Sequence, residues 1–408
     1  MGAKEHEKQL SRLVMGNETC CGCGLCAAKC PAKAITMQQS PTGFWRPVID
    51  FSACLNCGMC LKTCEALHQR GERDVSAHDS LQSECVAVWA NEREQAMRSS
   101  SGGILTALAR EVVRRGGVVS AAGFDADMVP TRLLAETERE VEAMAGSKYV
   151  QCRTRTEDFC KIKELVKAER LVLYIGTPCQ VSAVKAYIGK DSPYLLTADF
   201  LCHGTPSPLL LQKYMDWRQG QYRSRMVDMG FRGKEVQGWL RSSIDCRFEN
   251  GRVLHTRIDF DPFYGFFASL LSVNNACFAC RYASLTRVAD ITAMDYWHAP
   301  QELLRARGRL GMSLVLAHTA AGREIIHRLQ DEGTISTRPA ELAGYYRCQP
   351  AFCHAPAKPA RWDDFMRDLP LADFPSLQRQ YLPKRSFSYT LKGMLKWNMA
   401  KLIRLFRR

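Results

Sequence analysis

The chain has 408 residues, of which 46% are hydrophobic and 24% are charged, a composition that excludes an intrinsically disordered or low-complexity protein. Its formal charge is +14, yet no nucleic-acid recognition motif accompanies the excess of Lys and Arg, so no nucleic-acid partner is expected. No apolar run approaches the ~20 residues of a membrane-spanning helix, and the charged first residues lack the apolar core of a signal peptide, which predicts a cytoplasmic location.

Cysteine usage is the most informative feature of the composition. The chain holds 19 cysteines, and thiols in the cytosol stay reduced, so metal or redox chemistry is expected rather than disulfides. The first elements form a repeat of the pattern C-x2-C-x2-C-x3-C, in which one run recurs 34 residues later: Cys20, Cys23, Cys26 and Cys30, then Cys54, Cys57, Cys60 and Cys64. Strand-like segments 34–38 and 45–51 lie between the runs. Residues 12–72 are therefore predicted to form a small two-fold domain.

The spacing of the repeat is that of bacterial two-cluster ferredoxins, in which the fourth cysteine of each run ligates the cluster of the other run. We therefore predict two 4Fe–4S clusters, one held by Cys20, Cys23, Cys26 and Cys64, the other by Cys54, Cys57, Cys60 and Cys30. Zinc is the alternative, but zinc sites place paired ligands around one tetrahedral ion and fit two triplets poorly. Cys21 is interpreted as an additional thiol without a ligand role, and Glu65 stands where the second run would carry the counterpart of Pro31.

After a polar segment, 73–98, that is assigned to a linker, the pattern changes to alternating helices and strands. Strand-like segments separate helical segments at 102–116, 156–169 and 179–189. This alternation predicts a mainly parallel sheet covered by helices, of the α/β class with α+β features, over residues 99–335. An antiparallel hairpin is predicted over 240–260, with its turn at Asn250–Gly251.

Four cysteines of this second domain share a predicted location. Cys179 and Cys202 each follow the carboxyl end of a predicted strand, where ligand sites of open α/β sheets gather, and Cys277 and Cys280 form a C-x2-C. Together the four residues are candidates for a third 4Fe–4S cluster; buried structural cysteine is the alternative. The remaining cysteines show no spacing pattern and are interpreted as structural: Cys85, Cys152, Cys160, Cys246, Cys348 and Cys353.

The last part of the chain divides into an irregular segment, 336–387, and a predicted basic amphipathic helix, 388–408. Apolar residues fall on one face of that helix at helical spacing: Leu391, Leu395, Met399, Leu402 and Phe406. Such a helix can lie at the surface of an anionic membrane, which would place the protein peripherally on the inner face of the membrane. Packing against its own domain or a partner protein is the alternative.

Several stretches, in this order along the chain, resemble the beta subunits of the coenzyme F420 hydrogenase/dehydrogenase family, which depend on flavin and iron–sulfur clusters. They are "SSSGGILTAL", "GSKYVQ", "YIGTPCQVSAVKAYI", "DFLCHGTPSP", "FRGKEVQGW" and "CFACRYASLTRVADITAMDYW". The resemblance covers roughly residues 15 to 330 and is similar in layout to bacterial members associated with polysaccharide biosynthesis. Two departures, Met294 and His298, stand where the family usually has Gly and put the shape of the local pocket in doubt.

The resemblance implies FAD beside a 4Fe–4S cluster in the α/β domain, the latter on Cys179, Cys202, Cys277 and Cys280. It suggests that backbone N–H groups of the "SSSGG" turn face the flavin or its phosphates, with candidate cofactor-binding residues Ser100, Ser101, Gly102, Gly103, Thr106 and Lys148. The alternatives are a helix cap by Ser100 or Ser101 and an exposed surface lysine at Lys148. No G-x-G-x-x-G occurs, so a nicotinamide-binding Rossmann unit is not expected.

Three polar residues near the proposed third cluster leave two interpretations open. His203 follows a proposed ligand and either transfers a proton or is a structural histidine. Asp290 and Asp295 lie near the C-x2-C; Asp295 either faces the flavin or substrate or caps a loop. We assign no catalytic residue from the sequence.

The function that follows is an iron–sulfur flavoprotein oxidoreductase, which passes electrons from ferredoxin-type clusters through a third cluster to FAD and an organic substrate. A redox partner protein or a small electron donor is the expected partner. The alternative is an electron-relay subunit that docks on a separate catalytic protein. The substrate, the direction of electron flow and the use of coenzyme F420 are not legible in these residues.

Overall fold

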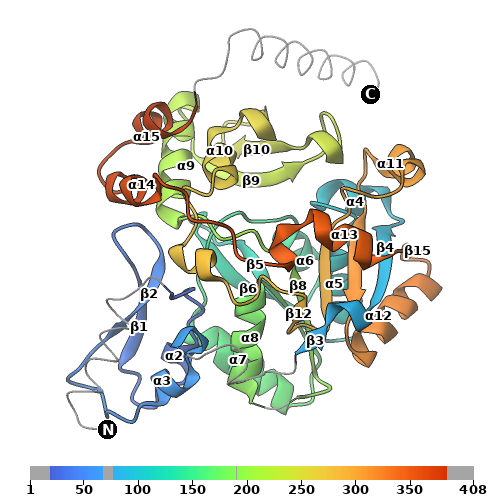
Figure 1. Ribbon diagram of the computed structural model, residues 1–408, viewed down its shortest axis with the longest axis horizontal. Coiled ribbons are helices and arrows are strands. Elements are labelled where there is room, and N and C mark those ends of the chain that lie inside the picture. The colour runs from blue at the N-terminus through green and yellow to red at the C-terminus, as the bar shows by residue number, and fades with distance from the viewer. Residues whose placement is uncertain (1–18, 68–76, 190, 384–408) are drawn as a thin grey trace.

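The computed structural model describes residues 19–67, 77–189 and 191–383. A small N-terminal unit lies beside a larger α/β body (Figure 1). In the small unit β1 (Ile35–Gln39) and β2 (Trp45–Ile49) form an antiparallel pair, which confirms the two predicted strands. Two short helices accompany the pair, α2 (Leu25–Ala28) and α3 (Met59–Thr63). Each follows a glycine in the left-handed region, Gly24 at φ 82° and Gly58 at φ 68°, a conformation that glycine adopts without strain.

An eight-stranded mixed sheet forms the centre of the larger body, in the order β15-β4-β14-β13-β8-β7-β5-β6. Its strands are β4 (Glu84–Ala90), β5 (Val118–Phe124), β6 (Pro130–Ala135), β7 (Val172–Gly176), β8 (Leu195–Phe200), β13 (Ile291–Asp295), β14 (Ser313–Ala317) and β15 (Ile335–Pro339). The adjacent pairs β13–β8, β8–β7 and β7–β5 are parallel, and antiparallel strands flank them on both sides. The predicted α/β class with a parallel core is therefore confirmed.

Helices cover both faces of this sheet. On one face α5 (Ile104–Arg114), α6 (Glu138–Met144) and α12 (Ala320–Asp331) pack on the strands through Leu108, Val112 and Ile326. On the other face lie α7 (Thr156–Lys167) and α8 (Pro178–Ile188), and their core cluster also takes in Leu25 of the small unit. The three predicted helices thus appear as α5, α7 and α8. The smaller elements at the sheet edges are β3 (His78–Asp79), α4 (Arg93–Arg98), β12 (Thr286–Arg287), α11 (Gln301–Arg307) and α13 (Leu342–Tyr345).

The predicted hairpin belongs to a separate three-stranded antiparallel sheet. It consists of β9 (Met226–Gly233), β10 (Ser243–Phe248) and β11 (Val253–Arg257), and the turn contains Gly251 at φ 80°. This sheet packs with α9 (Pro208–Tyr222) and α10 (Pro262–Ala268) in a second hydrophobic core.

Two segment assignments from the sequence differ from the structure. Residues 84–90, assigned to a linker, form β4 inside the main sheet, because this strand pairs with β14 and β15 and buries Ala87, Val88 and Ala90. The segment 336–387, predicted to be irregular, contains α14 (Trp362–Asp368) and α15 (Phe374–Tyr381). These helices cover the second core, where Phe374 stacks on Trp217 at 5.2 Å between ring centroids. The predicted helix 388–408 lies outside the described residues.

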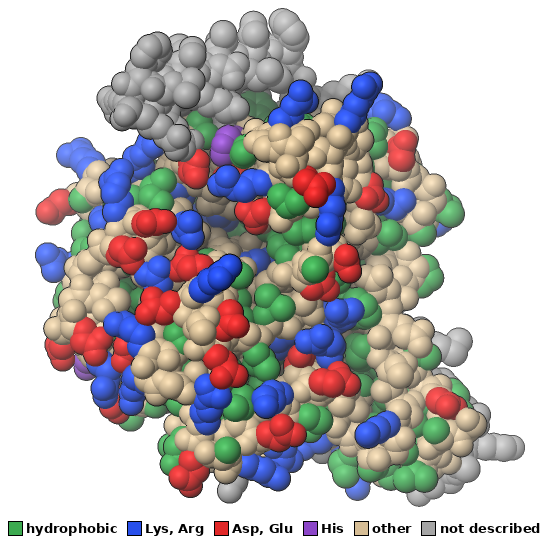
Figure 2. Space-filling view, turned by 180° about the vertical axis from the view of Figure 1, so that it is seen from behind, with side chains coloured by type: hydrophobic (Ala, Val, Ile, Leu, Met, Phe, Trp, Pro, Cys, Tyr) green, Lys and Arg blue, Asp and Glu red, His purple; other side chains and the backbone are tan. Residues whose placement is uncertain are grey.

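The charge of the molecule is distributed without a large patch of one sign on the face shown in Figure 2. There, Lys and Arg side chains alternate with Asp and Glu side chains over the described residues. Among those residues, none of the helices has both the length and the hydrophobicity that crossing a membrane requires.

One buried histidine should make the stability of the fold sensitive to acid. His318 follows β14, and its ring nitrogens form hydrogen bonds with Ser83 Oγ (2.6 Å) and Thr292 Oγ1 (2.9 Å). Burial, and to a smaller degree the Arg287 charge and His78, lower the pKa of His318 from 6.5 to about 3. Because the folded state disfavours the proton, this contribution to stability is present above pH 6.5 and is lost as the pH falls below it.

We expect the free energy of unfolding to fall by about 2 kcal/mol between pH 7 and pH 5 from this one residue. Urea titrations at both pH values measure it, and His318→Gln should lose much of that pH dependence. Equal pH dependence in the variant and the wild type would contradict the assignment.

Candidate functional site

The structure places the eight cysteines of the repeat in two groups of four, which we call the outer and the inner site. The outer site comprises Cys30, Cys54, Cys57 and Cys60, and these four residues line one small cavity together with apolar side chains such as Ile35 and Ile49. Burial raises the pKa of Cys60 to about 11, and the nearby Cys54 and Cys30 add to the rise. Four thiols around one apolar cavity suit a thiolate-ligated cluster, whose binding displaces the thiol protons.

The inner site comprises Cys20, Cys23, Cys26 and Cys64. Burial raises the pKa of Cys64 to about 12, and the neighbouring Cys20 and Cys21 add to the rise. The pKa of Cys26 is raised by burial first and then by Cys20 and Cys64. Cys64 therefore lies with the first triplet and Cys30 with the second, which is the crossed arrangement that the spacing predicts. The ligand role of these residues stays a prediction.

The four cysteines of the α/β body come together at one edge of the main sheet, and we call them the third site. Cys179 lies in the first turn of α8 after β7, and Cys202 lies just after β8, so the two parallel strand ends bring these residues side by side. The loop that carries Cys277 and Cys280 reaches the same place through an isolated bridge between Pro206 and Val273. Cys202 interacts with Cys280, and Cys277 interacts with both.

Polar groups of the third site point at sulfur atoms. Thr177 Oγ1 lies 3.1 Å from Cys179 Sγ, and the Gly204 N–H donates to Cys202 Sγ at 3.4 Å. Thr205 Oγ1 lies 4.0 Å from Cys277 Sγ. Burial nevertheless raises the pKa of Cys202 to about 12. Hydrogen bonds to sulfur set the reduction potential of an iron–sulfur cluster, so this donor set fits such a group.

Cys21 was interpreted from the sequence as an additional thiol without a ligand role, but the structure places it between two of the cysteine sites. Its thiol forms hydrogen bonds with Cys179 of the third site and with Cys23 of the inner site, and these bonds lower its pKa well below the ordinary value despite burial. It also lies close enough to Cys280 to raise the pKa of that thiol. Cys21 therefore bridges the two sites. The sequence carried one signal, the immediate neighbourhood of Cys20, but spacing alone could not show what Cys21 faces.

The small unit is held to the α/β body by hydrogen bonds at this bridge. Gln151 donates to the Cys21 carbonyl at 2.9 Å and accepts from the Trp45 N–H at 2.7 Å. Asn274, next to the C-x2-C loop, donates to the Cys20 carbonyl at 3.3 Å. A Cβ atom on Gly22 would lie 2.2 Å from Gln151 Nε2 and 2.6 Å from the Trp45 carbonyl oxygen, so only glycine allows the two backbones to approach this closely. Sequence reasoning did not identify Gln151 or Asn274.

The "SSSGG" stretch lies at the same sheet edge as the third site, because Gly102 is anchored where β4 ends and β14 begins. The Gly102 N–H donates to Ser313 Oγ at 3.0 Å, and Asp295 at the end of β13 pairs with Ser313. The hydroxyl groups are already bonded within the protein: Ser101 donates to the Met312 carbonyl at 2.7 Å, and Ser100 accepts from the Ser147 N–H at 2.7 Å. The expectation that Ser100 or Ser101 caps the helix is wrong.

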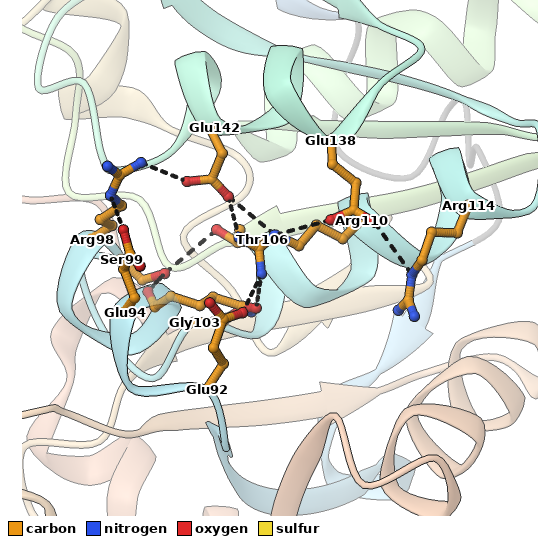
Figure 3. Close-up of polar contacts among 11 residues, drawn as sticks. Glu92, Glu94, Arg98, Ser99, Gly103, Thr106, Arg110, Arg114, Glu138 and Glu142 are labelled. Atoms are coloured by element: carbon orange, nitrogen blue, oxygen red, sulfur yellow. Dashed lines mark hydrogen bonds and ion pairs between the residues drawn. The ribbon is translucent and has the colours of Figure 1, made fainter.

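The N-cap of α5 is Gly103, at φ 93°, and no side chain caps this helix within the described part of the chain. Its first-turn N–H groups, including that of Thr106, are the donors that a phosphate would use. A charged network braces this turn from outside (Figure 3): Arg110 bonds Glu142 of α6 at 2.6 Å and Gln95 of α4 at 2.9 Å. Gln95 in turn donates to the Gly103 carbonyl at 3.0 Å.

Lys148 is neither an exposed surface lysine nor free to contact a flavin in this conformation. Its ammonium donates to the carbonyls of Met144, Ala145 and Gly146 at 2.7, 2.8 and 3.1 Å, and so it caps the end of α6. Desolvation lowers its pKa to about 8. A second lysine also donates to three backbone carbonyls. Lys234 is fully buried, and its ammonium bonds the carbonyls of Ala96, Ser101 and Leu310.

A polar network that includes Asp295 extends the site beyond the third-site cysteines. Arg232 forms an ion pair with Asp295 at 3.0 Å and donates to Tyr149 Oη at 3.1 Å. The Trp239 indole N–H donates to the same carboxylate at 2.8 Å, and the Arg232 guanidinium lies 4.9 Å from the centre of the Trp297 ring. Asp295 is thus held by two donors and does not merely cap a loop. Arg232 and Trp239 belong to the stretch "FRGKEVQGW", to which the sequence alone assigned no role.

The two other polar candidates divide clearly. Asp290 is structural: its carboxylate accepts from the Thr197 N–H at 2.8 Å and from Thr319 Oγ1 at 2.9 Å. The His203 side chain is exposed. Partial desolvation by the surrounding protein nevertheless lowers the pKa of His203, and the Asp295 carboxylate partly offsets this shift. The proton-transfer role of His203 therefore stays a prediction from the sequence.

Among residues 19–67, 77–189 and 191–383, no three His, Cys, Asp or Glu side chains converge closely enough to hold a single metal ion.

Comparison with known proteins gives matches to three family models and to several solved structures. The model for the carboxyl-terminal part of the coenzyme F420 hydrogenase/dehydrogenase beta subunit matches residues 169–342, the model for its N-terminal part matches residues 85–155, and a "4Fe-4S dicluster domain" matches residues 19–66. A chain of the F420-reducing [NiFe] hydrogenase complex from Methanosarcina barkeri aligns with a TM-score of 0.44 and 20% identity, covering 74% of this chain and 92% of that chain. No curated protein matches.

Proposed function

The chain belongs to the coenzyme F420 hydrogenase/dehydrogenase beta-subunit family and carries a 4Fe–4S dicluster domain, and from that premise we propose that it is an iron–sulfur flavoprotein oxidoreductase acting on an organic substrate. The observation that carries the proposal is the continuous series of cysteines from the outer site through the inner site and Cys21 to the third site. We propose that the cysteines of the inner and outer sites ligate two 4Fe–4S clusters and that the cysteines of the third site ligate a third 4Fe–4S cluster.

The proposed cofactors supply one-electron carriers at the cysteine sites and, with FAD, two-electron chemistry on a substrate. The residues of the chain hold and tune these groups. Thr177, Gly204 and Thr205 orient the sulfur atoms of the third site. Gln151 and Asn274 keep the inner site against the α/β body, which shortens the path between the sites.

For the flavin, the support is the uncapped first turn of α5 at the same sheet edge as the third site. Its N–H groups and the positive end of the helix suit a diphosphate. Gly103 and Thr106 are the proposed contacts through their backbone N–H groups. Gly102, Ser100, Ser101 and Lys148 would contact the cofactor only after releasing the bonds described above. Asp295, with Arg232, is the proposed polar group facing flavin or substrate.

That engagement of Ser100, Ser101 and Lys148 favours a second candidate function, an electron-relay subunit that docks on a separate catalytic protein. The context that we propose is cytoplasmic, in polysaccharide biosynthesis. From the sequence alone, we also propose that residues 388–408 make peripheral contact with a membrane. The redox partner is proposed to be a protein or a small electron donor.

Cofactor content separates the candidates. We expect anaerobically purified full-length protein to contain about twelve irons, a matching amount of acid-labile sulfide and one FAD per chain, as three four-iron clusters require. Iron and sulfide assays with flavin extraction measure this. Eight irons would remove the third site from the proposal, and clusters without flavin, together with no reduction of small acceptors, would establish the relay. Zinc without iron would contradict both.

A further inference from the structure

Arg46, in β2 of the small unit, is a buried cation beside the inner site. Its side chain is 7% exposed, and its guanidinium donates to Asn274 Oδ1 at 2.8 Å and to the Trp45 carbonyl at 3.2 Å. The Asn274 amide that accepts from Arg46 donates in turn to the Cys20 carbonyl at 3.3 Å, and the Arg46 charge acts electrostatically on the thiols of Cys20 and Cys21. Within the described ranges no carboxylate lies at ion-pair distance from it, and its other contact is the Phe44 ring, 5.2 Å away.

A buried guanidinium without an anion is costly, because desolvation of the charge is not offset by an opposite charge. Two other buried arginines have an ion-pair partner: Arg287 pairs with Asp199 at 2.9 Å and Arg232 pairs with Asp295 at 3.0 Å. Arg132 is fully buried without a carboxylate at ion-pair distance among the described residues, and its guanidinium instead lies 3.9 Å from the centre of the Tyr174 ring. For Arg46 the groups in the place of the carboxylate are the thiols of Cys20 and Cys21. A thiolate-ligated cluster at the inner site carries net negative charge and would compensate this cation.

The outer site has no corresponding cation. Its cavity is lined by cysteines, Pro31, Gly58 and apolar side chains, and no Lys or Arg is among the lining residues that the structure describes. The two sites, related by the sequence repeat, thus differ in charge environment. The asymmetry arises because β2 presents Arg46 to the side of the unit that faces Asn274 and the α/β body.

We propose that Arg46 is a positioning residue that raises the reduction potential at the inner site above that at the outer site, so that an electron entering the small unit settles next to the third site. The inference rests on the proposed function in that it requires clusters at both sites. One-electron reduction adds one negative charge to a cluster, and a cation beside the ligand Cys20 stabilises that charge; nothing on Arg46 is oxidised or reduced.

The test is a redox titration of the anaerobic holoprotein monitored by electron paramagnetic resonance. Cys64→Ser and Cys57→Ser assign the signals of the inner and outer sites. We expect Arg46→Gln to shift the midpoint potential of the inner signal in the negative direction. At a fixed potential, the ratio of reduced to oxidised inner cluster should fall tenfold or more, which corresponds to a shift of ~59 mV for one electron. The outer signal should not move, and Arg46→Lys, which keeps the charge, should retain most of the wild-type potential.

Arg153→Gln is the matched control. Arg153 also packs against Trp45, with its guanidinium 5.5 Å from the ring centre, but its charge is paired with Asp125 at 3.4 Å, so the variant should leave both potentials unchanged. If Arg46→Gln does not load clusters, Asn274→Asp replaces it, since this near-isosteric change keeps an acceptor for Arg46 and adds a negative charge. It should shift the inner signal in the same negative direction.

A loaded Arg46→Gln protein whose inner potential matches the wild type, or equal shifts of both signals, would overturn the role of Arg46 and leave the proposed function intact. Wild-type protein without iron would instead overturn the proposed function itself.

Discussion

Replacing Cys202 by Ser should remove about four irons per chain from the anaerobically purified protein, because one lost ligand leaves the third site without a complete thiolate set. Cys202 is the central member of that set, since it interacts with Cys280 and Cys277 and lies next to Cys179. The eight irons proposed for the inner and outer sites should remain. Reduction of bound flavin by an electron donor should slow by about 100-fold or more, as expected when a required element of a catalytic path is lost.

Iron and sulfide assays and stopped-flow absorbance on the same preparations measure both effects. Cys160→Ser is the matched control, because Cys160 is exposed on α7 and bonds only Tyr187 among the residues described. It should keep the wild-type iron content. Wild-type iron in Cys202→Ser would show that this thiol holds no cluster.

Gly102→Ala should destabilise the protein by about 2–3 kcal/mol and lower its flavin content. A Cβ atom at Gly102 would lie 2.4 Å from the Val88 carbonyl oxygen and 2.6 Å from the Ser313 nitrogen, which are backbone atoms of β4 and β14. The backbone of these two interior strands is paired on both sides and cannot move aside, so the loop must lift away from the strand ends, and overpacking of this kind costs energy. The Gly102 bonds to Ser313 and Ala90 would be lost with it.

The control for this substitution is Gly220→Ala in α9, where a Cβ atom would meet nothing within 4 Å. Alanine favours a helix over glycine by about 0.5–1 kcal/mol, so this variant should be slightly more stable than the wild type. Urea denaturation and flavin fluorescence after extraction measure the pair. A stable Gly102→Ala protein with full flavin would contradict both the close packing and the proposed flavin contact of this turn.

Local sequence patterns explain which parts of this structure can be predicted from the sequence. The two cysteine runs place their triplets within a few residues, so chain geometry alone groups Cys20, Cys23 and Cys26. Helices α5, α7 and α8 follow periodic apolar positions and appear where that periodicity predicts them. The strand-end rule for parallel sheets was sufficient to place Cys179 beside Cys202, because β7 and β8 pair in parallel.

Contacts between distant segments required the tertiary structure, since nothing local encodes them. β4 was assigned to a linker because its flanks are polar, and only its place between β14 and β15 explains why Ala87, Val88 and Ala90 are buried. The hydroxyls and the ammonium expected to contact flavin instead satisfy buried backbone groups at Met312, Ser147 and Met144.

The sequence by itself determined the family, the α/β class and the residues grouped as candidate ligands, because these depend on spacing within short segments. Only the tertiary structure decided what Cys21 and Arg46 face. Both residues lie at the contact between the small unit and the α/β body, and their partners, Cys179 and Asn274, are more than 150 residues away in the chain. Docking of two units sets the charge and hydrogen bonds at that contact, and no periodicity within either unit specifies it.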